Sequence, residues 1–288
     1  MSRVEELRQQ GLAKLRVNAI EEALSLFDQA LANAADDESR ELLTIDKAGA
    51  LLTMERTGPE VQKLPQILMR RRNVRHVYLA AYHLETKFRN EHDFSKAGFY
   101  ARIALEAAEE AGNQEWIASA LIALGMDCGF DSRDDEAAQY FQRALAVLPE
   151  KSDGLARAFA VHNLGYSKIM TASPAEGVEL IHKSIELFFG EGSEAFCAES
   201  YLDLCLGYLD LGDFEQARTF GELGLEKATE VRQTRNAHYL LGEISYKLGD
   251  VELAEFHFDH LATHYPDFPQ LKNLLFAIDL RKMVNFKL

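Results

Sequence analysis

The sequence predicts an all-α protein built from stacked helical hairpins, and two observations support this fold class. Apolar residues recur at intervals of three and four, the period of an amphipathic helix, and alternating β-branched runs are almost absent. In addition, one mostly small position returns every 34 to 40 residues, at Ala23, Lys63, Ala97, Ala137, Gly177, Ala217 and Ala254. A repeated unit of this length cannot bury its apolar face alone, so neighbouring units must stack on it.

The clearest unit runs from His238 to Pro266 and shows how two helices fold back on each other. Gly242 is small where the first helix lets its neighbour approach, and Gly249 ends that helix because glycine adopts a left-handed cap without strain. Asp250 is expected to cap the second helix by accepting from its free N–H groups. Phe258 then fills the gap between the helices, and the proline ends the second one.

The spacing of Leu241-Gly242, Ala254, Phe258 and Pro266 resembles that of a tetratricopeptide repeat. The resemblance implies a right-handed α-α superhelix, a TPR-like solenoid of about seven helix-turn-helix repeats closed by a capping helix. The expected repeats lie near 4–37, 38–74, 75–113, 114–151, 152–191, 192–230 and 231–266, followed by a capping helix and tail at 267–288.

Local signals place the helices of each repeat in order. The turn at Val17-Asn18, the stop at Thr57-Gly58-Pro59 and the caps Asp93 and Asp134 divide the first half of the chain. The helices expected there are 4–16, 20–34, 38–55, 59–72, 75–90, 94–111, 114–129 and 134–147.

In the second half, Ser173-Pro174 begins a helix with proline in its first turn. The helices expected there are 153–170, 175–189, 194–210, 214–230, 232–247 and 251–264. A last helix at 268–284 is expected to cover the open end of the stack with its apolar residues, including Met283, while Lys272, Asp279, Arg281 and Lys282 face water.

Composition narrows the classes of function. The 288 residues carry a net charge of -15, which argues against non-specific nucleic-acid binding and against an anionic membrane surface. The charged start of the chain is unlike a secretory signal, no apolar run is long enough to span a bilayer, and Phe286 does not fit a peroxisomal address. Cys128, Cys197 and Cys205 are expected to be buried free thiols, so a cytoplasmic location is predicted.

The resemblance places the first helix of each repeat on a concave groove, which is the best candidate site for a partner. Aromatic and Met side chains interleaved with Asn and His suit an extended peptide or an amphipathic helix. The alternative is that many of these aromatics pack only against adjacent repeats. The predicted groove residues are Tyr82, His83, Arg89, Met126, Phe130, His162, Asn163, Tyr166, Met170, Asp203, Leu206, Asp210, Tyr239, Glu243 and Tyr246.

Charge in the groove argues against one function known in the family. Tetratricopeptide co-chaperones hold an acidic peptide terminus with Asn and cations on successive repeats. Asn163 matches, but Glu199 and Asp203 stand where the next cations are needed and would repel a carboxylate. This acidity favours a partner that carries Lys or Arg.

Two further clusters have a functional and a structural interpretation each. Arg70, Arg71, Arg72 and Arg75 form a basic patch that could receive an acidic segment or a phosphate, or could be a solvated connection balanced by nearby acids. The residues His257, His260 and His264 share a helix face that could hold a metal, or could be surface or cap-packing histidines.

These observations predict a non-catalytic adaptor or scaffold that binds a protein or peptide segment in the groove, without a cofactor or a resident metal. The alternative is a ligand- or peptide-sensing regulator that acts on a partner in trans, because the 40-residue spacing resembles that of bacterial transcription activators and peptide-pheromone sensors. A metal-dependent enzyme using the histidine face is the third class. No nucleophile motif, phosphate loop or dinucleotide fingerprint is present. Self-association through the convex helices or the end repeats is left open.

Overall fold

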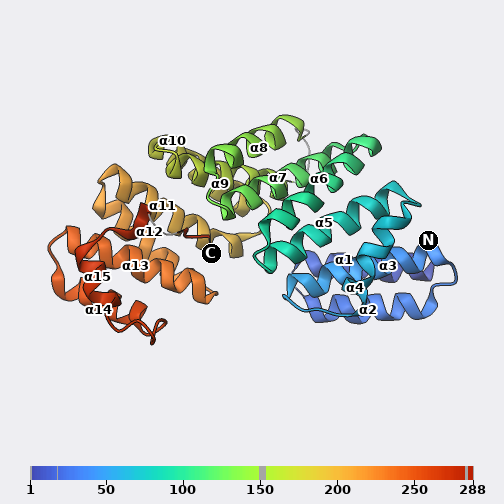
Figure 1. The fold of residues 1–288 in the computed structure, drawn as a ribbon, viewed down its shortest axis with the longest axis horizontal. Helices are drawn as coiled ribbons and strands as arrows, with labels where there is room; N and C mark the ends of the chain where they lie inside the picture. The colour runs from blue at the N-terminus through green and yellow to red at the C-terminus, as the bar shows by residue number, and fades with distance from the viewer. Residues whose placement is uncertain (1, 18, 149–153, 283–284, 288) are drawn as a thin grey trace. The chain divides into compact units, whose positions relative to one another are not determined.

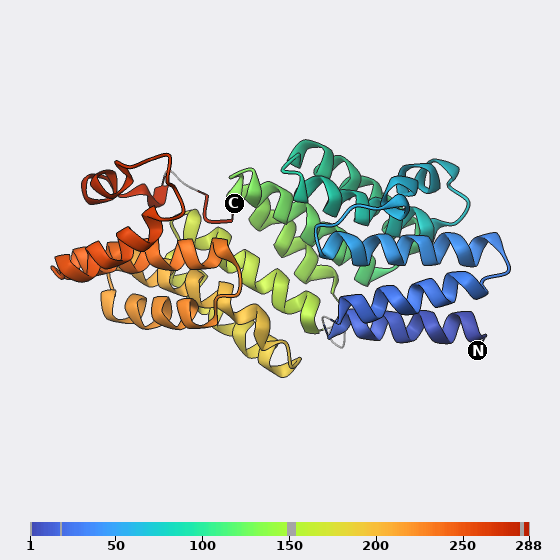
Figure 2. The same cartoon turned by 90° about the horizontal axis from the view of Figure 1, so that it is seen from below.

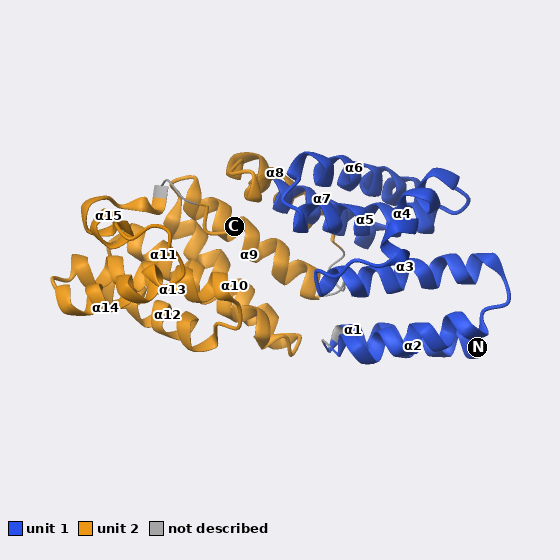
Figure 3. Ribbon diagram, turned by 60° about the horizontal axis from the view of Figure 1, so that its bottom comes forward, with its two compact units in different colours: residues 1–127 blue, residues 128–288 orange. Residues whose placement is uncertain are grey.

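The computed structural model describes residues 2–17, 19–148, 154–282 and 285–287 (Figure 1). Within these ranges the chain forms fifteen α-helices, two short 3-10 helices and no strand, which confirms the predicted all-α class. None of the helices in this part of the chain combines the length and apolarity that a membrane crossing requires. The chain divides into two compact units at 1–127 and 128–288, and the division falls inside α7 (Figure 3).

Unit 1 consists of helical pairs that pack in sequence order. Contacts join α1 to α2, α3 to α4 and α5 to α6, and each second helix α2 and α4 also contacts the first helix of the next pair. First helices contact one another as well, α1 with α3 and α3 with α5. The bounds are α1 Arg3–Arg16, α2 Ile20–Asn33, α3 Asp37–Thr53, α4 Pro59–Arg70, α5 Val74–Asn90, α6 Phe94–Ala111 and α7 Gln114–Phe130.

Unit 2 repeats this pattern. The pairs α9–α10, α11–α12 and α13–α14 each pack together, while the first helices α9, α11 and α13 contact one another in series (Figure 2). The bounds are α8 Asp134–Val147, α9 Gly154–Met170, α10 Pro174–Gly190, α11 Cys197–Leu211, α12 Phe214–Lys227, α13 Val231–Lys247, α14 Val251–Ala262 and α15 Leu271–Ala277, with 3-10 turns at Glu194–Phe196 and Leu280–Lys282. The repeat boundaries themselves stay a prediction.

Capping follows the predicted residues with one exception. Asp93 and Asp250 accept from the backbone N–H of Lys96 and Leu253 at 3.1 and 3.0 Å, as predicted. Gly249 has a φ of 81°, the left-handed conformation expected of it. Asp134 does not cap α8, because it lies inside the helix after Arg133 at the N-cap position.

The predicted last helix is wrong in its extent. Instead of covering 268–284, α15 spans only Leu271–Ala277, and Ile278 takes extended dihedrals (φ -140°, ψ 131°). Leu271 and Leu275 are buried as the capping role requires, but Arg281 does not face water, since its side chain is only 12% exposed. Lys272 lies on α15 and pairs with Asp259. Met283 and the side chain of Lys282 lie outside the described residues.

The core of each unit is built from small and aromatic residues in contact. Phe27 and Phe258 are fully buried, each against a glycine of the preceding helix. The three cysteines are buried and none of them is in a disulfide, as predicted.

Candidate functional site

The residues after α15 turn back and cover the first helices of unit 2. We call the described residues 279–282 and 285–287 the tail. It runs from α15 back across the unit in Figures 1 and 2. The tail-covered face is the set of side chains that it contacts on α9, α11 and α13: Tyr166, Glu199, Asp203, Asp210, Arg232, Asn236 and Tyr239.

Phe286 is held through both its backbone and its ring. Its carbonyl oxygen accepts a hydrogen bond from Asn236 Nδ2 at 2.7 Å and another from Arg232 at 3.1 Å. Its ring stacks on Tyr239 with 5.6 Å between centroids, and the side chain is only 6% exposed. Two donors on one carbonyl fix the path of the backbone, while the tyrosine provides an apolar contact for the ring.

Lys287 is bound by two carboxylates and one aromatic ring. Its Nζ lies 2.8 Å from an Asp203 oxygen, 3.0 Å from a Glu199 oxygen and 4.1 Å from the Tyr166 ring centroid. The ammonium group thus makes charge-assisted hydrogen bonds and a cation–π contact at the same time. The predicted preference of this acidic surface for a cation is met here by a lysine of the same chain.

Two carboxyl groups near Lys287, those of Glu199 and Asp134, have pKa values shifted in opposite directions. Burial alone would raise the pKa of Glu199, but the ammonium of Lys287 and the guanidinium of Arg232 hold that pKa well below its usual value. Arg232 makes two contacts of 3.0 Å with the Glu199 oxygens. Burial and the neighbouring Asp135 raise the pKa of Asp134 to about 6, although Lys287 opposes the shift.

Asn285 and Arg281 make further contacts of the tail. Asn285 donates to the carbonyl oxygens of Gly129 and Phe130, both at 3.0 Å, near the end of α7. Arg281 pairs with Asp210 at 2.7 Å. Beside it, burial and Asp279 raise the pKa of Glu243 to about 7.

The other groove residues predicted in unit 2 either contact a residue of this site or pack against other residues of the unit. His162 is buried and lies 3.2 Å from an Asp203 oxygen. Asn163 donates to the carbonyl of Phe159 in its own helix, and Leu206 is part of the core. The side chain of Met170 packs against that core, and Tyr246 is 45% exposed with its ring edge-on to Phe276.

The groove residues predicted in unit 1 pack against their neighbours. His83 lies against Gly49, and burial lowers the pKa of its imidazole to about 4. Arg89 pairs with Glu85 at 2.8 Å. Tyr82 lies 5.9 Å from the Tyr78 ring. Met126 is partly buried on α7. A peptide-binding role for these four residues stays a prediction.

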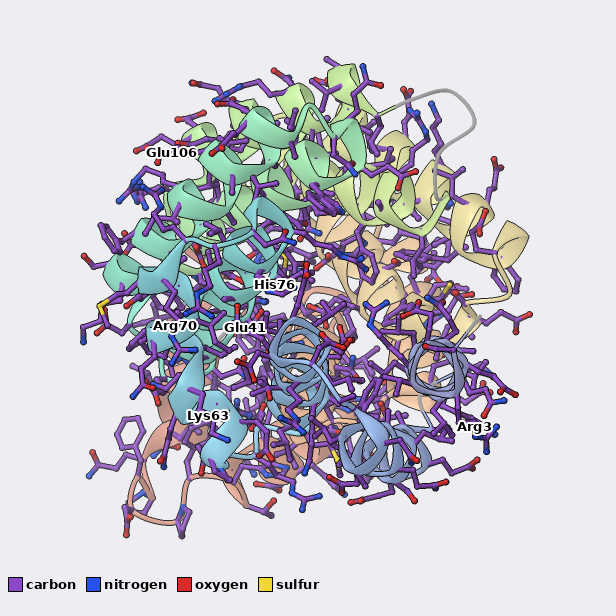
Figure 4. The ribbon with its side chains drawn as sticks, turned by 90° about the vertical axis from the view of Figure 1, so that its right-hand side faces the viewer. Arg3, Glu41, Lys63, Arg70, His76 and Glu106 are labelled. Carbon is purple, nitrogen blue, oxygen red and sulfur yellow. The ribbon has the colours of Figure 1, made fainter. Side chains whose placement is uncertain are left out.

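The basic patch is partly neutralised by acids of α3. Arg70 and His76 both approach Glu41, at 3.5 and 2.9 Å, and these three side chains lie close together in Figure 4. Asn73 donates to Glu38 at 2.9 Å, while Arg71, Arg72 and Arg75 are exposed. This arrangement fits the interpretation of a solvated connection with nearby balancing acids.

The histidine face packs against α13. His257 is buried and its Nδ1 lies 3.0 Å from Nδ1 of His238, while His260 stacks on the same imidazole at 4.9 Å. Burial and the neighbouring histidines lower the pKa of His238 to about 4. Among the described residues, no group of three or more His, Cys, Asp or Glu has an arrangement that could hold a metal.

Comparison with solved structures defines the class of fold. No protein-family model and no curated protein matches the sequence. The chain is similar to NprR in complex with its cognate peptide NprX, with 12% identity and a TM-score of 0.70 over 95% of this chain and 82% of that one. It is also similar to a Rap protein complexed with Competence and Sporulation Factor, with 18% identity and a TM-score of 0.68 over 92% of this chain and 75% of that one.

A tetratricopeptide repeat protein from Parabacteroides merdae is similar too, with 15% identity and a TM-score of 0.56 over 95% of this chain and 97% of that one. The chain therefore has the fold of tetratricopeptide-repeat proteins, as the repeat spacing predicts.

The tail is the part of the site that sequence reasoning missed. Asn285, Phe286 and Lys287 carry no repeat motif, and Arg232 was not among the predicted groove residues. The sequence signal that could have indicated this contact was charge. Glu199 and Asp203 lie one helical turn apart on a first helix, so a cation is expected to bind between them.

Proposed function

We propose that the chain is a non-catalytic protein that binds a peptide, or an extended segment of a partner protein, on the tail-covered face of unit 2. The observation that carries the proposal is how this face holds Phe286 and Lys287. Arg232 and Asn236 bind the main chain, and separate groups bind each side chain. Main-chain contacts give affinity for an extended segment, and side-chain contacts give selectivity.

Charge supports a partner that carries lysine or arginine. Two cations of the tail pair with acids of this face. Lys287 pairs with Glu199 and Asp203, and Arg281 pairs with Asp210. A peptide with an acidic residue at the same place would meet like charges and be rejected.

The similarity to structures of NprR with NprX and of a Rap protein with Competence and Sporulation Factor supports a second form of this function. In that form the chain is a peptide-sensing regulator that acts on a partner in trans. A decrease in the radius of gyration when a peptide binds, measured by small-angle scattering, would favour the sensor over the adaptor.

The test is a selection of displayed random peptides on the full chain. Glu199→Gln with Asp203→Asn keeps the shape of the site and removes two charges, so the selected peptides are expected to bind this variant at least about tenfold more weakly. The matched control is Glu106→Gln with Glu109→Gln, which removes two exposed charges of α6 in unit 1, outside the tail-covered face. Absence of enriched peptides, or equal loss of binding in both variants, would refute the proposed site.

A further inference from the structure

The tail contacts the face as a ligand does, residue by residue. Asn285, Phe286 and Lys287 are consecutive, and each is held by different partners: backbone carbonyls at the end of α7, Tyr239 with two donors of α13, and the acids of α11. None of the three is part of a helix. The segment therefore adds no hairpin to the stack.

The face keeps internal partners for its charges when the tail is set aside. Glu199 retains two contacts of 3.0 Å with Arg232, and Asp203 retains His162 at 3.2 Å. A buried carboxylate that lost its sole partner would destabilise the fold strongly. Because both acids have a second partner on the first helices, departure of Lys287 leaves a formed, acidic site.

We propose that the tail is an internal ligand of the peptide site, that an incoming peptide displaces it, and that the site selects peptides in which an aromatic residue directly precedes a lysine. The proposal rests on the proposed function. Phe286 and Lys287 define this selectivity, because the ring fits Tyr239 and the ammonium fits Glu199 and Asp203.

Tethering makes the internal ligand an effective competitor. A segment joined by a short linker is present at an effective concentration on the order of 1 mM. If the tail binds the open site with a Kd of about 100 µM, an external peptide would therefore bind the tail-covered chain about tenfold more weakly than the open one. The site responds only to peptides that are abundant or that bind more tightly than the tail.

The experiment compares full-length chains with a defined probe. The probe is a peptide with the sequence of residues 279–288, amidated at its C-terminus and labelled at its N-terminus with an uncharged fluorophore, and its binding is followed by anisotropy. Phe286→Ala with Lys287→Glu releases the tail, so the probe is expected to bind this variant at least about tenfold more tightly than the wild type. A probe carrying Lys287→Glu is expected to lose binding to both.

Lys272→Glu is the matched control, because Lys272 pairs with Asp259 on α14, outside the tail-covered face. It should bind the probe as the wild type does. If circular dichroism shows that the double variant does not fold, the single variant Lys287→Glu replaces it in the experiment, since it changes one side chain and leaves Phe286 in place.

Three results would overturn the proposal: equal probe affinity for wild type and both tail variants, equal binding of the charge-reversed probe, or a wild-type dimer that exchanges tails between copies. Failure here is distinct from failure of the proposed function. If displayed peptides still need Glu199 and Asp203 but bind wild type and tail variants equally, the peptide site stands and the internal ligand does not.

Discussion

At the scale of single residues, two glycines set how closely a helical pair can pack. A Cβ atom on Gly11 would lie 2.5 Å from a ring carbon of Phe27, and one on Gly242 would lie 2.3 Å from the equivalent ring carbon of Phe258. Both rings are fully buried and have no room to shift. The same contact thus recurs in the first and last pairs, which explains why the sequence spacing of Gly and Phe is informative.

Gly11→Ala is therefore expected to lower the free energy of unfolding by about 1–3 kcal/mol through overpacking. The control is Gly98→Ala in α6, where the nearest atom to an added Cβ is the Arg102 guanidinium at an ordinary 3.6 Å. Alanine there should stabilise by about 0.5–1 kcal/mol through helix propensity. Urea unfolding followed by the fluorescence of Trp116, the single tryptophan, reports on unit 1. Equal effects of the two substitutions would contradict the packing argument.

At the scale of helices, local sequence signals predict a helix end correctly where residues within one turn of that end determine it. Asp93, Asp250 and Gly249 act within one turn of where they stand, and the helices beside them begin and end within a few residues of the predicted bounds. The last helix failed because its end is set by distant partners. Arg281 pairs with Asp210, 71 positions earlier, and such a contact has no local pattern.

The candidate site was predictable to a similar degree. Tyr166, Asp203, Asp210 and Tyr239 were predicted as groove residues, and a single segment contacts all four, while their role in binding a partner stays a prediction. That the segment comes from the same chain could not be inferred, since a one-dimensional repeat pattern does not say where residues outside the repeats go.

Near the contact between the tail and α13, the carboxyl group of Glu243 is expected to make the stability of the fold depend on pH. Burial and Asp279 raise its pKa to about 7 from a usual value of 4.5, with Lys247 and Arg281 opposing. The folded chain therefore favours the protonated carboxyl, and the stability associated with it is lost as pH rises from about 5 through 7. Glu243→Gln cannot ionise, so the variant should become more stable than the wild type as pH rises across this window.

The measured quantity is the difference in unfolding free energy between the two chains at about pH 5 to 8. Taking the difference matters because buried histidines with lowered pKa, such as His238, change stability with the opposite sign as pH falls. A difference that stays constant across this range would show that Glu243 ionises normally in the folded chain.

At the scale of the whole molecule, the net charge of -15 acts on any approaching partner before contact. A field of one sign accelerates the encounter with opposite charges and slows that with like charges. The 279–288 peptide has three cationic side chains against one carboxylate, so the field attracts it. Long-range attraction and the local acids Glu199 and Asp203 therefore favour the same class of ligand.

This field predicts that the association rate constant of the 279–288 peptide with the Phe286→Ala, Lys287→Glu chain falls at least about threefold between roughly 20 and 300 mM salt. The matched control peptide carries Arg281→Gln and Lys282→Gln, which brings its side-chain charge to zero and keeps the aromatic–lysine pair. Stopped-flow anisotropy should give a nearly salt-independent association rate for that peptide, because long-range steering needs a net charge. If both peptides show the same salt dependence, the effect arises from the local contacts of Lys287 and not from the field of the chain.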